Sequence, residues 1–338
     1  MVKIAILGAG FVGDIHANAY SQVQGAEVAA VVDKSGEKGK KMAESSGAEY
    51  YGSLEELFEK ADIDCVDICV PTFLHHDMVM KIAPKNKHIF CEKPLTLTLE
   101  DADKMVEAVK DRDIISMVGH EIRFWPEYVK AKEYLESGVL GKPLHIFCQR
   151  LASFPDWHDK NWGSDEKLSG GAALDLHIHD LDYMLWLFGK PALVKAQGVY
   201  NPDIIKHGGL VHIDTSVEFE NGVTGFAEGG WAFRGSFPFT MVLRILCEKG
   251  TIEWIFRAGK NIEERSQKSN LTVFKNDGST ETLDVEQKDA FLAELSYFVD
   301  CIENNRPVEN ATFEDGRNAV ELALAAISSA KEKTVINF

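Results

Sequence analysis

Residues 2–13 read VKIAILGAGFVG, and this stretch decides the fold of the N-terminal part of the chain. An apolar, β-branched run leads directly into three glycines in G-x-G-x-x-G spacing. In such a turn the first glycine permits the tight bend, the second admits a pyrophosphate, and the third lets helix and strand pack closely. The helix that follows offers unpaired N–H groups and a positive dipole end to phosphates. The stretch therefore predicts a dinucleotide site that includes Gly8, Gly10, Phe11, Val12 and Gly13.

An acidic residue ends the second apolar run of the chain. Asp33 follows residues 27–32 and stands twenty positions beyond Gly13. A carboxylate at that distance accepts hydrogen bonds from the adenosine ribose and repels a 2′-phosphate. We therefore expect the cofactor to be NAD, with NADP disfavoured even though Lys34 could meet a phosphate.

Strand and helix signals alternate through the first third of the chain. Nearly continuous apolar strands separated by helices indicate a parallel sheet covered on both faces, and hence a Rossmann-type, doubly wound α/β fold. A capping box, Ser53-Leu-Glu-Glu56, marks one helix start. The expected strands are Val2–Leu7, 27–32, 65–70, 88–91 and 114–118.

The pattern changes beyond residue 122, where strands begin to follow one another. Asn221-Gly222 is the strongest hairpin signal, and residues 248–250 and 276–278 also suggest turns. We expect a C-terminal α+β domain with a large, mostly antiparallel open sheet, giving domains 1–122 and 123–338. Helices are expected at 126–137, 289–304 and 312–333, and strands at 144–151 and between 194 and 283. It is left open whether the last helices pack back on the first domain.

Composition narrows the class of partner and the compartment. The 338 residues carry a formal net charge of −17, which argues against nucleic acid or an anionic membrane as partner. Neither a signal peptide nor an uncharged apolar run long enough to span a bilayer is recognisable. Six scattered cysteines without a C-x-x-C pair suggest reduced thiols. A cytoplasmic location is therefore expected.

Lys93 occupies a position typical of catalysis. It lies in Cys91-Glu-Lys-Pro94, at the expected carboxyl end of a parallel strand, where open α/β sheets bind ligands. An ammonium beside a reacting oxygen would stabilise alkoxide character as hydride leaves. By residue type alone, an exposed lysine before a proline is the simpler interpretation.

Asp175 and His179 are four residues apart in an expected helix at 173–188, so they project from nearly one face. Such a pair suits general base chemistry, although an interhelical hydrogen-bonding pair is the alternative. On an ideal helix His177 points away from His179, so the two cannot share a tetrahedral ion. We therefore expect no metal site, and we expect His177 at the surface or at a helix–helix contact.

Five motifs together resemble the glucose–fructose oxidoreductase / inositol dehydrogenase / MocA family. They are GAGFVG, then PTFLH at 71–75, HIFCEKPL at 88–95, GHEIRF at 119–124 and SGGAALDLHIHDLD at 169–182. The resemblance covers residues 1 to 190 in order and spacing. It implies that Lys93 is catalytic beside the nicotinamide, that His179 accepts the hydroxyl proton, and that Asp175 is its partner. It also implies a cis or strained peptide before Pro94.

The resemblance suggests further residues around the ligands. Thr72 and His75 would line the ribose and nicotinamide side of the cofactor, and Glu92 would lie near the nicotinamide ribose. Arg123 could bind substrate oxygens, with a surface salt bridge as the alternative. Trp162 ends an aromatic and polar stretch of the kind that packs on sugars, although it could equally anchor a loop.

The function expected from the sequence is hydride transfer between NAD and a carbinol or carbonyl of a sugar, polyol or sugar derivative. Two alternatives are an NAD-dependent glycoside hydrolase that oxidises its substrate transiently and a non-catalytic NAD-binding regulator. The open sheet face needs a cover. Because members of the resembled family commonly bury it between subunits, a homodimer or homotetramer is expected.

Overall fold

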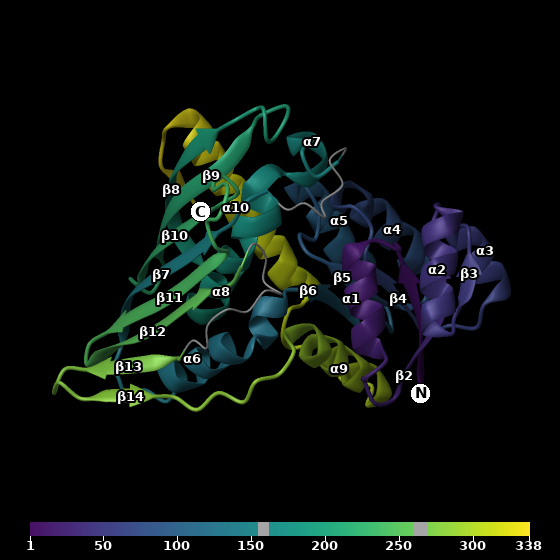
Figure 1. The fold of residues 1–338 in the computed structure, drawn as a ribbon, viewed down its shortest axis with the longest axis horizontal. Coiled ribbons are helices and arrows are strands. Elements are labelled where there is room, and N and C mark those ends of the chain that lie inside the picture. Colours follow the sequence, from purple (N-terminus) through teal and green to yellow (C-terminus); the bar gives the residue numbers. More distant parts are fainter. Residues whose placement is uncertain (155–161, 260–269) are drawn as a thin grey trace. The chain divides into compact units, whose positions relative to one another are not determined.

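A computed structural model describes residues 1–154, 162–259 and 270–338 (Figure 1). The chain divides into two compact units. Unit 1 comprises Met1–Phe124 and Lys288–Arg317, and unit 2 comprises Trp125–Gln287 and Asn318–Phe338. Among the described residues, no helix combines the length and the apolar character needed to cross a bilayer.

Unit 1 is built on a parallel sheet whose six strands, among the described residues, run in the order β3-β2-β1-β4-β5-β6. This order is that of a doubly wound dinucleotide-binding fold and confirms the predicted class. The three-residue strand β3 was not predicted, because so short a segment shows no periodicity. The strands are β1 Val2–Leu7, β2 Ala26–Val32, β3 Glu49–Tyr51, β4 Cys65–Ile68, β5 His88–Glu92 and β6 Ser116–Gly119.

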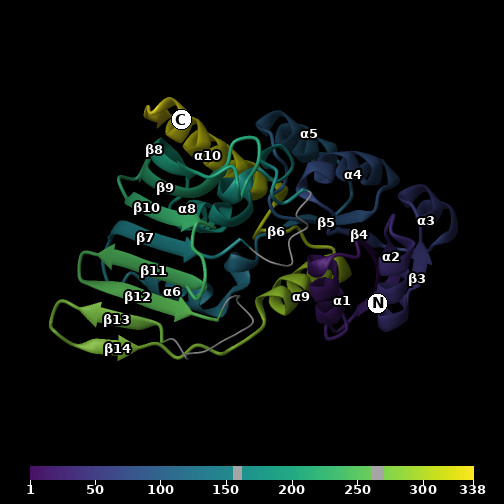
Figure 2. The same ribbon diagram turned by 45° about the horizontal axis from the view of Figure 1, so that its top comes forward.

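The helices that follow Gly10, Ser53 and Asp289 begin where the sequence signals predict. The hydroxyl of Ser53 caps α3 by accepting the backbone N–H of Glu56 at 3.2 Å. The Glu56 carboxylate accepts the backbone N–H of Gly52, whereas in a complete capping box it would accept that of Ser53. Helix α9, from late in the chain, packs on α1 (Figure 2). The helices are α1 Phe11–Tyr20, α2 Gly36–Ser46, α3 Leu54–Lys60, α4 His75–Ile82, α5 Leu99–Lys110 and α9 Ala290–Glu303, with short 3-10 turns η1 Thr72–Leu74, η2 Ala83–Lys85 and η3 Glu121–Phe124.

Unit 2 carries a nine-stranded sheet in the order β14-β13-β12-β11-β7-β10-β9-β8-β15, counted over the described residues (Figure 2). Its pairs are antiparallel except for β7 with β10. The hairpin predicted at Asn221-Gly222 joins β9 to β10, with Gly222 at a φ of +83°. The strands are β7 Pro143–Leu151, β8 Pro191–Tyr200, β9 Leu210–Phe219, β10 Thr224–Gly230, β11 Thr240–Cys247, β12 Gly250–Arg257, β13 Thr272–Lys275, β14 Thr280–Thr282 and β15 Ile336–Asn337.

The two faces of this sheet differ in burial. From Ile213 onward in β9 and from Leu243 onward in β11, buried residues alternate with more exposed ones, as expected when helices cover one face only. Tyr183 of α8 and Tyr128 of α6 pack edge to face at 4.7 Å on the covered side. The remaining helices are α6 Pro126–Glu136, α7 Glu166–Ser169, the π-helix η4 Ala173–His177, α8 Ile178–Phe188 and α10 Phe313–Glu332.

Candidate active site

The glycine turn after β1 has the steric properties that a pyrophosphate site needs. Gly8 has a φ of +111°, and a Cβ there would lie 2.6 Å from the carbonyl oxygen of Cys69. A Cβ on Gly13 would collide with the carbonyl oxygen of Gly8. A Cβ on Gly10, in contrast, would meet no described atom within 4 Å. Gly8 and Gly13 are therefore needed for close backbone packing, whereas Gly10 faces open space at the start of α1.

Asp33 lies beside this turn at the end of β2. Its Oδ2 accepts the N–H of Ala9 at 2.7 Å, and its Oδ1 accepts the N–H of Ser35 at 2.6 Å. The side chain is half-buried. Each carboxylate oxygen can accept a further hydrogen bond, so Asp33 can brace the turn and still bind ribose hydroxyls.

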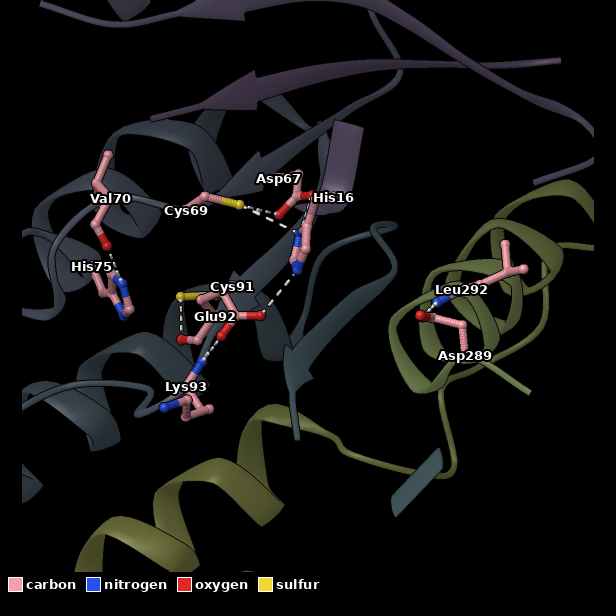
Figure 3. Close-up of polar contacts among 10 residues, drawn as sticks. All are labelled: His16, Asp67, Cys69, Val70, His75, Cys91, Glu92, Lys93, Asp289 and Leu292. Carbon is pink, nitrogen blue, oxygen red and sulfur yellow. Dashed lines mark hydrogen bonds and ion pairs between the residues drawn. The ribbon is translucent and has the colours of Figure 1, made fainter. Parts of the chain in front are cut away.

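Lys93 follows β5 in a turn held by its neighbour (Figure 3). The backbone N–H of Lys93 donates to Oε2 of Glu92 at 3.2 Å. The Lys93–Pro94 peptide is cis, as the family resemblance implied. Glu92 is buried, and its Oε1 lies 3.2 Å from Nε2 of His16. Both oxygens of Glu92 thus have partners within unit 1.

The structure gives His75 contacts that the sequence did not suggest. Its Nδ1 lies 2.9 Å from the Pro94 carbonyl oxygen, and its Nε2 lies 2.9 Å from that of Val70. His75 and Thr72 are both buried. Burial lowers the pKa of His75, although the two carbonyls oppose this. His75 therefore braces the loop after β4 against the Lys93–Pro94 turn.

Asp175 and His179 lie on a helix that differs from the one expected. The sequence predicted one regular helix over 173–188, but Asp175 lies in the π-helix η4 and His179 in α8. Because a π-turn has i→i+5 hydrogen bonds, the expected i, i+4 alignment does not carry over. Asp175 is half-buried and His179 is buried. Wide turns of this kind are frequent at functional sites.

The expectation for His177 was wrong. The side chain is fully buried against the sheet, with Nε2 at 2.9 Å from the hydroxyl of Thr215 on β9. A Cβ on Gly229 of β10 would lie 2.5 Å from Nδ1 of His177, so the ring needs a glycine opposite it. Burial lowers the pKa of His177 to about 3. His177 is thus a neutral anchor of the π-turn.

The two expected substrate-binding residues have different surroundings. The side chain of Arg123 is 2% exposed and lies 3.1 Å from the carboxylate of Asp315, which is 30% exposed, so the ion pair is buried on the arginine side only. Trp162 is half-buried. The aromatic stretch that precedes it falls at 155–161, outside the described residues.

The sequence did not reveal a polar set in unit 1 formed by the buried His16, Asp67 and Glu294 with the half-buried Cys69. Its members come from α1, β4, the loop after β4 and α9, so no local spacing connects them. A carboxylate within the apolar run CVDICV was the available signal. Among the described residues, His16 with Asp67 and Cys69, or with Glu92 and Glu294, places possible metal ligands within 4.8 Å of one another. The absence of a metal stays a prediction.

Two sequence families match the chain. The oxidoreductase family with an NAD-binding Rossmann fold matches residues 2–120, and the GFO/IDH/MocA C-terminal domain matches residues 128–253. The chain is 31% identical to a myo-inositol 2-dehydrogenase of Thermotoga maritima, over 98% of this chain and 97% of that protein. It is also 31% identical to a scyllo-inositol 2-dehydrogenase (NAD(+)) of Bacillus subtilis, over 97% of this chain and 94% of that protein.

Other similarities are partial or concern the fold alone. A 2,7-anhydro-N-acetylneuraminate hydratase of Mediterraneibacter gnavus is 32% identical over 56% of this chain and 50% of that protein. An oxidoreductase from Agrobacterium radiobacter, solved with NAD+, L-tartaric acid and magnesium, superposes with a TM-score of 0.86 at 24% identity. That superposition covers 99% of this chain and 98% of the other, and it confirms the two-sheet fold.

Proposed function

This chain belongs to the GFO/IDH/MocA oxidoreductase family, and on that premise we propose that it is an NAD-dependent dehydrogenase oxidising a carbinol of an inositol, sugar or related polyol. The observation that carries the proposal is the position of Lys93. It follows the carboxyl end of β5 in a sheet of dinucleotide-binding order, in a turn braced by Glu92 and His75. Ligands of such sheets bind at that edge.

The residues present fit a nicotinamide dinucleotide. The space at Gly10 and the helix end at Phe11 suit a pyrophosphate, and Asp33 suits an unphosphorylated ribose. NAD is therefore proposed over NADP. When bound, the cofactor supplies the acceptor for a carbon-bound hydride.

The proposed chemistry divides between three side chains. His179 accepts the proton of the substrate hydroxyl, as a neutral imidazole can. Lys93 stabilises negative charge on the same oxygen, and Asp175 orients the hydroxyl or supports the protonated imidazole. The reverse reduction uses the same groups in the opposite order. Thr72, Arg123 and Trp162 are proposed to contribute to binding.

A second candidate function is transient oxidation without net redox change. The similarity to proteins named as hydratases favours it, since their names describe no net oxidation. A non-catalytic regulator is the remaining alternative, but such a protein has no need of Lys93, Asp175 and His179 together.

The deciding experiment combines the purified chain with NAD+ and a panel of carbinols, with NADP+ in parallel. The panel contains inositols, aldoses, sugar acids, amino sugars and anhydro sugars. NADH absorbance appearing with an inositol or sugar would support the dehydrogenase. Consumption of a panel member without NADH would overturn it in favour of transient oxidation. NAD+ binding by calorimetry, with every panel member unchanged, would instead favour the regulator.

A further inference from the structure

A chain of buried charged groups adjoins Lys93 within unit 1. His16 comes from α1, Asp67 from β4 and Glu92 from the end of β5. Glu294 reaches the same place from α9. All four side chains are buried, and none of the four was assigned a catalytic role above.

The contacts run in sequence from the sheet to the backbone of Lys93 (Figure 3). Nδ1 of His16 lies 2.8 Å from Oδ2 of Asp67, and Nε2 of His16 lies 3.2 Å from Oε1 of Glu92. The other oxygen of Glu92 accepts the Lys93 N–H at 3.2 Å. A displacement of the imidazole would therefore be passed on to the turn that carries Lys93.

The partners of His16 fix its charge. Nδ1 of His16 is hydrogen-bonded to Asp67, and Nε2 makes an ion-pair contact with Glu92 that does not have hydrogen-bond geometry. Burial by itself lowers the pKa of His16, but Asp67 and Cys69 outweigh it and hold that pKa well above its usual value. A charged ring between two carboxylates has a single favourable orientation.

Aromatic rings and the carboxyl group of Glu294 surround His16. The rings of Phe90 and Phe291 lie 5.5 and 5.8 Å from the imidazole, and Tyr20 packs edge-on at 6.5 Å. Burial and then the charge of Glu92 hold the pKa of Glu294 well above its usual value. Neither oxygen of Glu294 has a hydrogen-bond partner among the described residues. Burial thus favours the neutral form of Glu294 beside the ion pairs.

We propose that His16 is a positioning residue which, anchored by Asp67, fixes Glu92 and through Glu92 the backbone of Lys93 for hydride transfer. The inference rests on the proposed function because it takes Lys93 as the catalytic ammonium. A misplacement of about 1 Å in a reacting group costs on the order of a hundredfold in rate. His16 thus contributes to catalysis without contacting substrate or cofactor.

The test uses two substitutions that each remove one of the two contacts. In His16→Asn the short amide keeps the bond to Asp67 but does not reach Glu92. In His16→Gln the longer amide reaches Glu92 and gives up Asp67. Each variant loses one buried contact, so thermal stability should fall by similar amounts. A general structural role would therefore affect both variants equally.

The first readout needs no substrate. Hydrogen–deuterium exchange is followed in the peptide that carries the Lys93 N–H, where Pro94 contributes no amide. The Lys93 amide should exchange about tenfold faster in His16→Asn than in the native chain and remain slow in His16→Gln. With a substrate from the panel, single-turnover hydride transfer should slow about tenfold or more in His16→Asn and less than about threefold in His16→Gln.

Equal changes in the two variants, or none in either, would overturn the proposal. A stoichiometric metal ion in the purified protein, lost in Glu294→Gln, would also overturn it, since Nε2 would then bind the metal. A different experiment shows whether the proposed function itself is wrong. A fully active Lys93→Ala enzyme would remove Lys93 from the chemistry, whereas the exchange experiment would still report whether His16 holds the turn.

Discussion

At the scale of single residues, Asp33 combines a structural and a binding role. It accepts the backbone N–H groups of Ala9 and Ser35, and so joins the end of β2 to the glycine turn. The same carboxylate is the group proposed to select NAD. A substitution that tests the binding role of Asp33 must therefore remove its charge while keeping the size of the side chain.

Asp33→Asn is expected to shift the ratio of kcat/KM values towards NADP+ by about tenfold, because repulsion of the 2′-phosphate is lost while one acceptor oxygen remains. The measurement compares both cofactors at saturating substrate. Asp33→Ala, which removes the charge and also both acceptor oxygens, serves as the control for the turn and should lower kcat/KM for both cofactors below the values of Asp33→Asn. An unchanged ratio in Asp33→Asn would remove Asp33 from cofactor selection.

Lys93→Ala is expected to lower turnover by about a hundredfold or more while NADH binding stays nearly native. Turnover is measured with a panel substrate and binding by NADH fluorescence. Lys104→Ala is the matched control, because Lys104 is an exposed lysine of α5 paired with Glu100. Near-native turnover in Lys93→Ala would contradict the assignment.

The candidate-site residues that the sequence could single out are those defined by local spacing. The glycines, Asp33 and Lys93 each follow a strand at a fixed distance, so a linear pattern can find them. His16 and Glu294 come from opposite ends of the chain and meet only after folding. Sequence periodicity carries no information about such a meeting.

At the scale of elements, the π-turn Ala173–His177 determines how the proposed catalytic helix begins. Periodicity predicted one regular helix, because a single widened turn barely alters the apolar pattern. The last residue of the turn, His177, has its contacts on the sheet. Thr215 binds the His177 ring, and Gly229 leaves space for it. The turn therefore depends on residues far from it in sequence.

The pH dependence of stability tests this anchor. Because the pKa of His177 falls from 6.5 to about 3 on folding, its contribution is complete above pH 6.5 and is lost as pH falls towards 3. The loss is about 1.4 kcal/mol for each pH unit in that window. Calorimetry of His177→Gln should show a shallower fall in Tm between those limits than the native chain.

Thr215→Val is the control for the His177 experiment. It removes the hydroxyl partner but leaves the titrating imidazole buried, so it should lower Tm while keeping the native steepness with pH. Parallel pH profiles for the native chain and His177→Gln would show that His177 does not titrate with folding.

At the scale of the whole molecule, the main feature is the open face of the nine-stranded sheet. The sequence predicted that this face needs a cover, but not which group covers it. Phe147 and Phe226 stack there at 5.9 Å, and Arg244 lies over Phe147 at 5.7 Å. Turn signals predicted its hairpins well, because such turns are local. No local sequence pattern shows that Lys288–Arg317 returns to unit 1, so the sequence left open where the last helices pack.

We expect the chain to form a homodimer or homotetramer through this face, as measured by light scattering at micromolar concentration. Ile255→Asp should shift the assembly towards monomer, because Ile255 of β12 is 42% exposed on the open face. Val139→Asp is the control, since Val139 is 52% exposed outside the sheet. A native chain that is monomeric would contradict the prediction.

The sheet of unit 2 interrupts the polypeptide of unit 1, which stops at Phe124 and resumes at Lys288. A fragment truncated after Phe124 would lack α9 and expose the Phe90 ring, which packs on Phe298 at 5.4 Å. An excised cofactor module would instead need a splice between residues 124 and 288. Unit 2 is divided as well, because β15 of its sheet follows Arg317, so neither unit can be exchanged as one continuous segment.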